Sequence, residues 1–184
     1  MSKNLYMVLL GCKPNGRFTE QHDVFFGIGE SLTALKKDME IFWPEANGKL
    51  HVDAWRLVSI VEHYRVHVVE RMESIVSPQS PKLFFVNLGG YREGEFEEHH
   101  YKQLIVARSP EEAASNAKST SFFKNFISPH IDDRYGLDVD DICVVEDALP
   151  HYIRKKYQLL IEPETALVDP NDEFHIGYLK FAQL

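Results

Sequence analysis

The feature that most constrains this chain is an internal repeat. The segment Leu5–Gly11 resembles Leu83–Gly89, and a shift of 78 positions (83 minus 5) pairs 9 identical residues over the 36 positions from Leu5 to Glu40. Because the chain can be compared with itself, the repeat shows which residues both copies keep. The identical pairs are Leu5/Leu83, Val8/Val86, Leu10/Leu88, Gly11/Gly89, Gly16/Gly94, Phe18/Phe96, Glu20/Glu98, His22/His100 and Ser31/Ser109.

A repeat of this length predicts two similar halves. Each half is near the lower limit for burying a core of its own, so we expect the halves to pack against each other. The predicted division is a first repeat over residues 1–73, a linker over 74–82 and a second repeat over 83–184. Pro78 and Pro81 are typical of such a boundary.

Composition narrows the class of protein and its partners. Apolar residues make up 44% of the chain and twelve are Phe, which indicates a packed globule. The formal net charge of −8 argues against a nucleic-acid or anionic-membrane partner. There is neither an apolar run of about 20 residues that could span a bilayer nor a signal-peptide pattern. Cys12 and Cys143 fall at non-equivalent positions and predict two free thiols in a cytoplasmic protein.

Each copy begins with the pattern of a hairpin followed by a helix. An apolar run over 4–11 predicts a strand, and Asn15-Gly16 and Glu93-Gly94 predict turns. The returning strands are expected over 17–28 and 95–107. Ser31 and Ser109 are placed as N-caps, with helices over 31–42 and 109–121.

Further strands are expected after each helix. They end at 58–62 and 142–146, and the last strand of each copy covers 65–70 or 157–162. Residues 174–181 predict an extra C-terminal strand in the second copy. The predicted fold class is therefore α+β, with two ββαββ repeats related by an approximate twofold and packed as a fused dimer, mostly antiparallel sheet. A homo-oligomer is left open.

The repeat also retains a polar set. Side chains two apart in a strand share a face, so Glu20 lies with His22, and His51 lies with Asp53. If the fold joins these segments, each copy presents two imidazoles and two carboxylates. The candidate ligand-binding residues are Glu20, His22, His51 and Asp53 in the first copy and Glu98, His100, His130 and Asp132 in the second.

Three interpretations of this polar set stay open. Two His with carboxylates form a common ligand set for a divalent transition metal such as Zn²⁺, with His22, His51, His100 and His130 as the nitrogen ligands. Alternatively, His and Glu act as a general acid/base pair. A purely structural role is the third interpretation, because buried polar groups need partners.

The motifs resemble a known bacterial family. The pattern Leu-Phe-Phe-Val-Asn-Leu-Gly-Gly, then Gly-x-Phe-x-Glu-x-His, then a helix and His-Ile-Asp, is similar to the family called domain of unknown function 1543. The resemblance covers residues 5–70 and 83–162 as two tandem copies. It implies a bacterial cytoplasmic protein and no particular activity, substrate or cofactor.

The function expected from the sequence is binding of a small molecule or metal ion by the two Glu/His/His/Asp sets. The alternatives are a metal-assisted hydrolase or other small enzyme, and a protein-interaction module in which these residues are structural.

Overall fold

A computed structural model describes residues 3–72, 79–132, 142–165 and 172–184 of the chain. Contacts divide the chain into two compact units, one made of Met1–Arg71 with Ala148–Leu184 and the other of Met72–Asp147. The C-terminal part of the predicted second repeat therefore groups with the first unit. Of the predicted linker, residues 74–78 lie outside the described residues. Each unit is α+β with antiparallel strand pairs, as expected.

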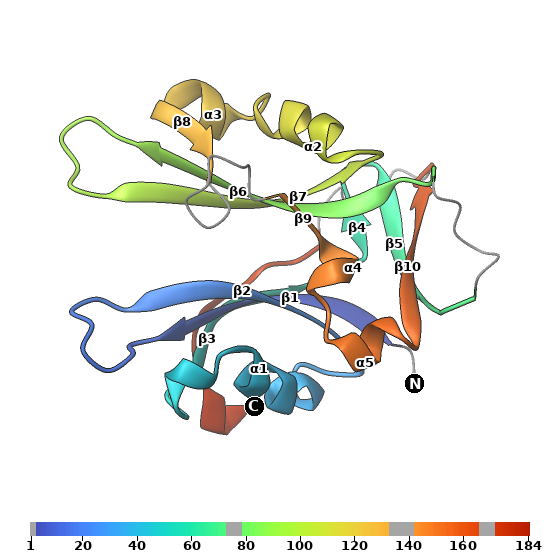
Figure 1. Cartoon of the computed structure of the whole chain (residues 1–184), viewed down its shortest axis with the longest axis horizontal. Coiled ribbons are helices and arrows are strands. Elements are labelled where there is room, and N and C mark those ends of the chain that lie inside the picture. Colours follow the sequence, from blue (N-terminus) through green and yellow to red (C-terminus); the bar gives the residue numbers. More distant parts are fainter. Residues whose placement is uncertain (1–2, 73–78, 133–141, 166–171) are drawn as a thin grey trace. The chain divides into compact units, whose positions relative to one another are not determined.

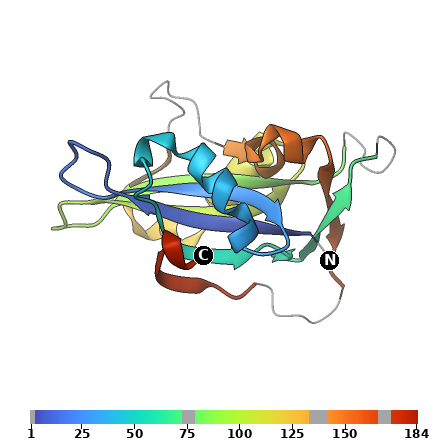
Figure 2. The same cartoon turned by 90° about the horizontal axis from the view of Figure 1, so that it is seen from below.

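The first unit contains a four-stranded antiparallel sheet (Figure 1). Its order is β11–β3–β1–β2, with β1 at Asn4–Cys12, β2 at Gln21–Gly29, β3 at His51–Leu57 and β11 at His175–Lys180. The short helix α1, Lys36–Phe42, lies across one face of this sheet (Figure 2). Leu35 and Met39 fill the core between helix and sheet, together with Val8, Leu10 and Val52. Burial of this apolar surface stabilises the unit.

A second, three-stranded sheet also belongs to the first unit. It contains β4 (Ile60–Val61), β5 (Tyr64–Glu70) and β10 (Tyr157–Pro163), in the order β10–β5–β4. The short helix α5, His151–Arg154, precedes β10. The strands predicted to end the two repeats thus pair with each other, with Leu160 opposite His67. The predicted strand over 174–181 is confirmed as β11, and its partner is β3 of the first copy.

The second unit is built around β6, Lys82–Tyr91. Its antiparallel neighbours are β7 (Glu98–Ala107), β8 (Ile127–Ile131) and β9 (Ile142–Val144). Helices α2 (Pro110–Ala117) and α3 (Ser121–Asn125) follow β7. Ala113 and Ala117 are fully buried in the core with Phe84, Val86 and Ile105. Small residues on α2 allow the helix to approach the sheet closely.

Several predicted boundaries were wrong. The returning strands begin at Gln21 and Glu98 instead of 17 and 95, because each hairpin has a longer tip. Gly16 and Gly94 adopt positive φ there, at 79° and 80°. The predicted helix 31–42 begins with a 3-10 turn at Thr33–Leu35, and the predicted helix 109–121 divides into α2 and α3.

The N-cap predicted at Ser109 is confirmed, whereas the N-cap position of the first helical turn is Leu32 and Ser31 lies one residue before it. The backbone N–H of Glu112 donates to Ser109 Oγ at 3.2 Å, and that of Ala34 donates to Ser31 Oγ at 3.2 Å. The strand predicted to end at Glu146 was too long, since β9 stops at Val144 and the helical turn α4, Val145–Ala148, begins there. None of the helices in the described ranges is long and apolar enough to cross a membrane.

Candidate functional site

In the first unit, strand register brings two histidines to the two sides of one glycine. His22 on β2 lies opposite Gly11 on β1, and His51 on β3 lies opposite the same glycine. Directly opposed residues in antiparallel strands point to one face of the sheet. A methyl group on Gly11 would collide with His51 Nε2 and Asp53 Oδ2, so only glycine leaves the space that the imidazole occupies.

The four side chains predicted for the first copy meet above this glycine. We call Glu20, His22, His51 and Asp53 the first set. His51 Nε2 lies 3.0 Å from Glu20 Oε1 and 3.4 Å from Asp53 Oδ2. His22 Nε2 lies 3.2 Å from Asp53 Oδ2 and 3.8 Å from Glu20 Oε2. The first set is therefore a convergent arrangement of two ring nitrogens and two carboxylates.

Two atoms of the first set are buried and unsatisfied. Within the part of the chain that the structure describes, neither His51 Nε2 nor Asp53 Oδ2 has a hydrogen-bond partner, since their ion-pair contacts lack hydrogen-bond geometry. His51 is only 5% exposed. An unsatisfied buried polar atom costs about 1–3 kcal/mol, so its presence in a native fold needs an explanation.

A β-bulge and a neighbouring aromatic ring position two members of the first set. Leu9 pairs with Ala54 and Leu10 with Val52, which leaves Asp53 as the extra residue of a β-bulge. Bulges change the direction of a side chain next to functional sites. On the other side, the ring of Tyr178 from β11 lies 4.5 Å from the His51 ring, centroid to centroid.

The second unit repeats the arrangement. His100 on β7 and His130 on β8 both lie opposite Gly89 on β6. We call Glu98, His100, His130 and Asp132 the second set. His130 Nε2 lies 3.3 Å from Glu98 Oε1 and 3.6 Å from Asp132 Oδ1. His100 Nε2 lies 3.6 Å from Glu98 Oε2 and 3.6 Å from Asp132 Oδ2. A methyl group on Gly89 would lie 2.6 Å from His130 Nε2.

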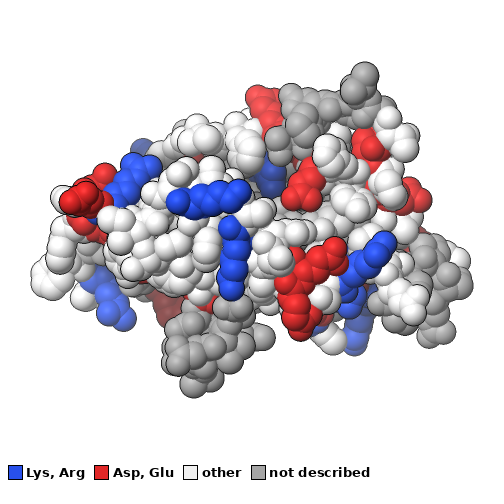
Figure 3. Space-filling view, turned by 90° about the horizontal axis from the view of Figure 1, so that it is seen from above, with Lys and Arg blue, Asp and Glu red and all other residues white. Residues whose placement is uncertain are grey.

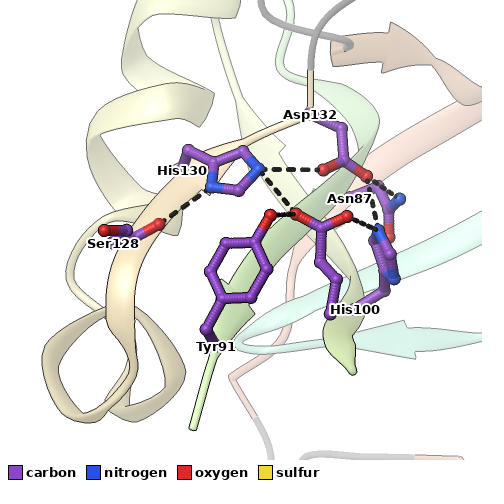
Figure 4. A network of polar contacts seen from close by, with 7 residues as sticks. Asn87, Tyr91, His100, Ser128, His130 and Asp132 are labelled. Carbon is purple, nitrogen blue, oxygen red and sulfur yellow. Dashed lines mark hydrogen bonds and ion pairs between the residues drawn. The ribbon is translucent and has the colours of Figure 1, made fainter. Parts of the chain in front are cut away.

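Surrounding groups orient the second set (Figure 4). The hydroxyl of Tyr91 donates to Glu98 Oε1 at 2.6 Å, and the Asn87 amide donates to Asp132 Oδ2. His130 Nδ1 lies 2.9 Å from the carbonyl oxygen of Ser128. Ser128 adopts a φ of 45°, which a non-glycine residue seldom adopts.

The contact with Ser128 places a proton on one ring nitrogen of His130. A carbonyl oxygen only accepts, so Nδ1 of His130 carries a proton and donates it. Nε2 then faces two carboxylates either as a bare lone pair or as the second N–H of an imidazolium. A lone pair directed at carboxylates is unfavourable unless a cation lies between them. His130 therefore makes, through Nδ1, the hydrogen bond to a backbone carbonyl that metal-binding histidines typically make.

Both sets contain carboxylates close to imidazoles, and in the second set this environment shifts the pKa of Asp132. Burial raises the pKa of the Asp132 carboxyl, the nearby His100 and His130 oppose that shift, and Glu98 adds to it. The chain has 28 acidic and 20 basic residues. On the face in Figure 3, basic and acidic side chains are both scattered over the surface. Each set contains two of these 28 acidic residues.

The spacing of the atoms can be compared with a metal site. Among the described residues, no group of three or more His, Cys, Asp or Glu side chains is placed so that it could hold a metal ion. Ligands at about 2.0–2.1 Å from a tetrahedral Zn²⁺ are separated from one another by about 3.3–3.4 Å. The nitrogen–oxygen distances of 3.0–3.8 Å in the first set bracket that value. The side chains of the first set would have to move from these positions before they could hold an ion.

All eight residues singled out from the sequence lie in these two sets, four in each unit. The other histidines lie elsewhere, and His99, for example, contacts Glu95 at 2.6 Å. Sequence reasoning missed the supporting residues Asn87, Tyr91 and Ser128, and it gave Gly11 and Gly89 no role in the site. The identity of these two glycines in both copies was the available signal, because both lie under a pair of histidines.

Comparisons with known proteins support the fold and part of the family resemblance. Residues 17–68, which include the whole first set, match the model of the family described as Domain of Unknown Function (DUF1543). The sequence matches no curated protein. The crystal structure of a protein Il1583 from Idiomarina loihiensis is similar, with 21% sequence identity and a TM-score of 0.65. The match covers 97% of this chain and 98% of that one, and it shows that the two share a fold.

Proposed function

We propose that each Glu/His/His/Asp set binds one divalent transition-metal ion, with Zn²⁺ as the reference ion. The observation that carries this proposal is the convergence of two Nε2 atoms and two carboxylates in each unit, over a glycine that makes room for them. His and carboxylate ligands suit Zn²⁺, Mn²⁺ and Fe²⁺. A cation in the first set would satisfy the buried Nε2 of His51 and Oδ2 of Asp53 together.

A bound ion would stay accessible to other molecules. His51 is buried, whereas His22 and Glu20 are about two-fifths exposed, so the first set is open on one side. In the second set His130 is also two-fifths exposed. If three of the four side chains coordinate a tetrahedral ion, one position remains for water or a small ligand, which is the arrangement of metal sites that bind or transform small molecules.

The competing explanation is a network of imidazolium–carboxylate ion pairs without metal. The exposed pairs of this network, such as His22 with Glu20, contribute little to stability, about 0–1 kcal/mol each. They also do not explain why His51 Nε2 lacks a hydrogen bond although two carboxylates lie within 3.4 Å of it. A metal ion placed between these groups would give His51 Nε2 a partner.

Calorimetric titration of the untagged, chelator-treated protein with ZnCl₂ tests the proposal. We expect two bound ions per chain in the wild type and one in each of the double variants His22→Gln/His51→Gln and His100→Gln/His130→Gln. The exposed His63 supplies a matched control, because His63→Gln removes an imidazole outside both sets. Because His51 is buried, its replacement could destabilise the fold as well as remove a ligand. His22 is exposed, so the single variant His22→Gln removes a ligand without disturbing the core. No zinc uptake by the wild type, or unchanged uptake in both double variants, would refute the proposal.

We further propose that the two sets descend from one duplicated module of this family. The support is the shared register, with Gly11 opposite His22 and His51, and Gly89 opposite His100 and His130. A bacterial, cytoplasmic protein is part of the same proposal. Its support is the family resemblance and the two free thiols of Cys12 and Cys143.

A further inference from the structure

The tips of the two hairpins have the same local geometry. In the β1–β2 tip, Arg17 N donates to Pro14 O at 3.3 Å, and in the β6–β7 tip, Glu95 N donates to Arg92 O at the same distance. Each turn contains a glycine at positive φ, Gly16 or Gly94. The residue two positions after that glycine is Phe in both tips. Phe18 and Phe96 are therefore presented by the same turn in the two units.

Both phenylalanines are completely exposed to solvent, as far as the described residues go. A single exposed apolar side chain on a protein surface needs no explanation. Here, however, both copies keep the same aromatic residue at a position where it contributes nothing to either core. Placing an aromatic ring in water is unfavourable, so retention of the ring points to a role in contacting something else.

Each phenylalanine comes immediately before a set. Phe18 precedes Glu20 by two residues, and Phe96 precedes Glu98 by two residues. Two residues of extended chain span about 7 Å at most, which is within the reach of an aromatic side chain. A molecule attached to an ion in the set could therefore touch the ring.

We propose that Phe18 and Phe96 bind the apolar part of a small organic ligand whose oxygen donor coordinates the metal ion in the adjacent set. This inference rests on the proposed function, since the set must first hold the ion. The ligand class is a carboxylate-like or hydroxamate-like chelator that carries an apolar group next to its donor atoms. Binding sites of this kind combine a few polar anchors with aromatic contacts.

Hydroxamates serve as probes of this arrangement. Acetohydroxamate and benzohydroxamate offer the same metal-binding group, but only the second carries a ring. In the zinc-loaded wild type, we expect benzohydroxamate to bind more tightly than acetohydroxamate. In the variant Phe18→Ala/Phe96→Ala, the Kd for benzohydroxamate should rise about three- to tenfold, the range expected for an aromatic contact. The Kd values for acetohydroxamate and Zn²⁺ should not change.

Controls separate this inference from the proposed function. Ile41→Ala removes an exposed apolar side chain of α1, which belongs to neither hairpin tip. It should leave both hydroxamate affinities unchanged. Failure of the wild type to bind zinc would refute the proposed function before hydroxamate is added. Zinc binding with the same benzohydroxamate affinity in wild type and Phe18→Ala/Phe96→Ala would overturn the inference alone. A change in sedimentation of that variant, with hydroxamate binding unchanged, would also overturn it and assign the tips to a protein partner.

Discussion

Gly11 lies directly opposite His51 across the β1–β3 pair, and the imidazole occupies the space where a side chain on residue 11 would begin. Gly89 and His130 have the same relationship in the second unit. These pairs explain why the glycines are retained in both copies, although neither adopts a positive φ. Strand register and the missing Cβ together create the space in which each set converges.

Gly89→Ala should displace His130 and weaken zinc binding by the second set. The added methyl group would lie 2.6 Å from His130 Nε2 and 2.7 Å from Asp132 Oδ1, so the side chains must move apart. We expect a Kd at least tenfold higher, within the range for disturbed ligand support. Leu83→Val in the same strand is the control, because it costs stability in the core without touching the set. Equal zinc affinities of Gly89→Ala and Leu83→Val would contradict this account of the glycine.

Asn87→Leu should weaken the second set without affecting the first. The Asn87 amide donates to Asp132, whereas the corresponding residue of the first copy is Leu9. Loss of such an outer hydrogen bond lowers metal affinity by about 10–100-fold. Zinc titration of Asn87→Leu in the background His22→Gln/His51→Gln isolates the second set. The variant Leu9→Asn makes the reciprocal change in the first copy. An unchanged zinc Kd in Asn87→Leu would show that Asn87 does not support Asp132.

Tyr178→Ala should affect only the first set. The Tyr178 ring lies 4.5 Å from the His51 ring and comes from the C-terminal strand β11. Loss of an aromatic pair is worth about 0.5–1.5 kcal/mol, so the zinc Kd of the first set should rise about two- to tenfold. Titration in the background His100→Gln/His130→Gln measures this effect. Tyr178→Phe keeps the ring and should bind zinc as the wild type does.

The Tyr152 hydroxyl gives a prediction of pH dependence in the first unit. Burial raises the pKa of Tyr152 to about 12, and its 2.5 Å hydrogen bond to Asp38 acts in the same direction. A Tyr pKa above its unfolded value of about 10 adds stability below pH 10. That contribution is lost as the pH rises from 10 toward 12.

Tyr152→Phe should therefore show a smaller loss of stability over this pH range than the wild type. The tyrosinate absorbance of the wild type, after subtraction of that of Tyr152→Phe at the same pH, reports the titration of Tyr152 directly. Asp38→Asn should move that titration to lower pH, because it removes the acceptor charge beside the hydroxyl. A Tyr152 titration near pH 10 in the wild type would contradict this prediction.

Much of the fold could be predicted from local sequence, because the relevant signals are local. The apolar run of β1, the hairpin glycines and the N-cap Ser109 all act over a few residues, and all three appear in the structure. The pairing of β5 with β10 could not be predicted. It joins residues about 90 positions apart, for example His67 and Leu160, and such pairing depends on tertiary contacts.

The same distinction applies to the candidate site. Two-residue periodicity and the repeat correctly grouped Glu98 with His100 and His130 with Asp132, and register then joined the two segments through Gly89. The contact between His130 and the Ser128 carbonyl could not be predicted, because it depends on a backbone conformation with positive φ at Ser128. Periodicity in a sequence carries no information about such a local departure.

Anomalous diffraction from crystals of the zinc-loaded protein, recorded on both sides of the zinc absorption edge, tests the central claim most directly. We predict one zinc peak between His22 Nε2, His51 Nε2 and Asp53, and a second between His100 Nε2, His130 Nε2 and Asp132. Crystals of His22→Gln/His51→Gln should keep only the second peak. Absence of zinc peaks from both sets, or peaks only at other surface residues, would contradict the claim that these sets bind metal.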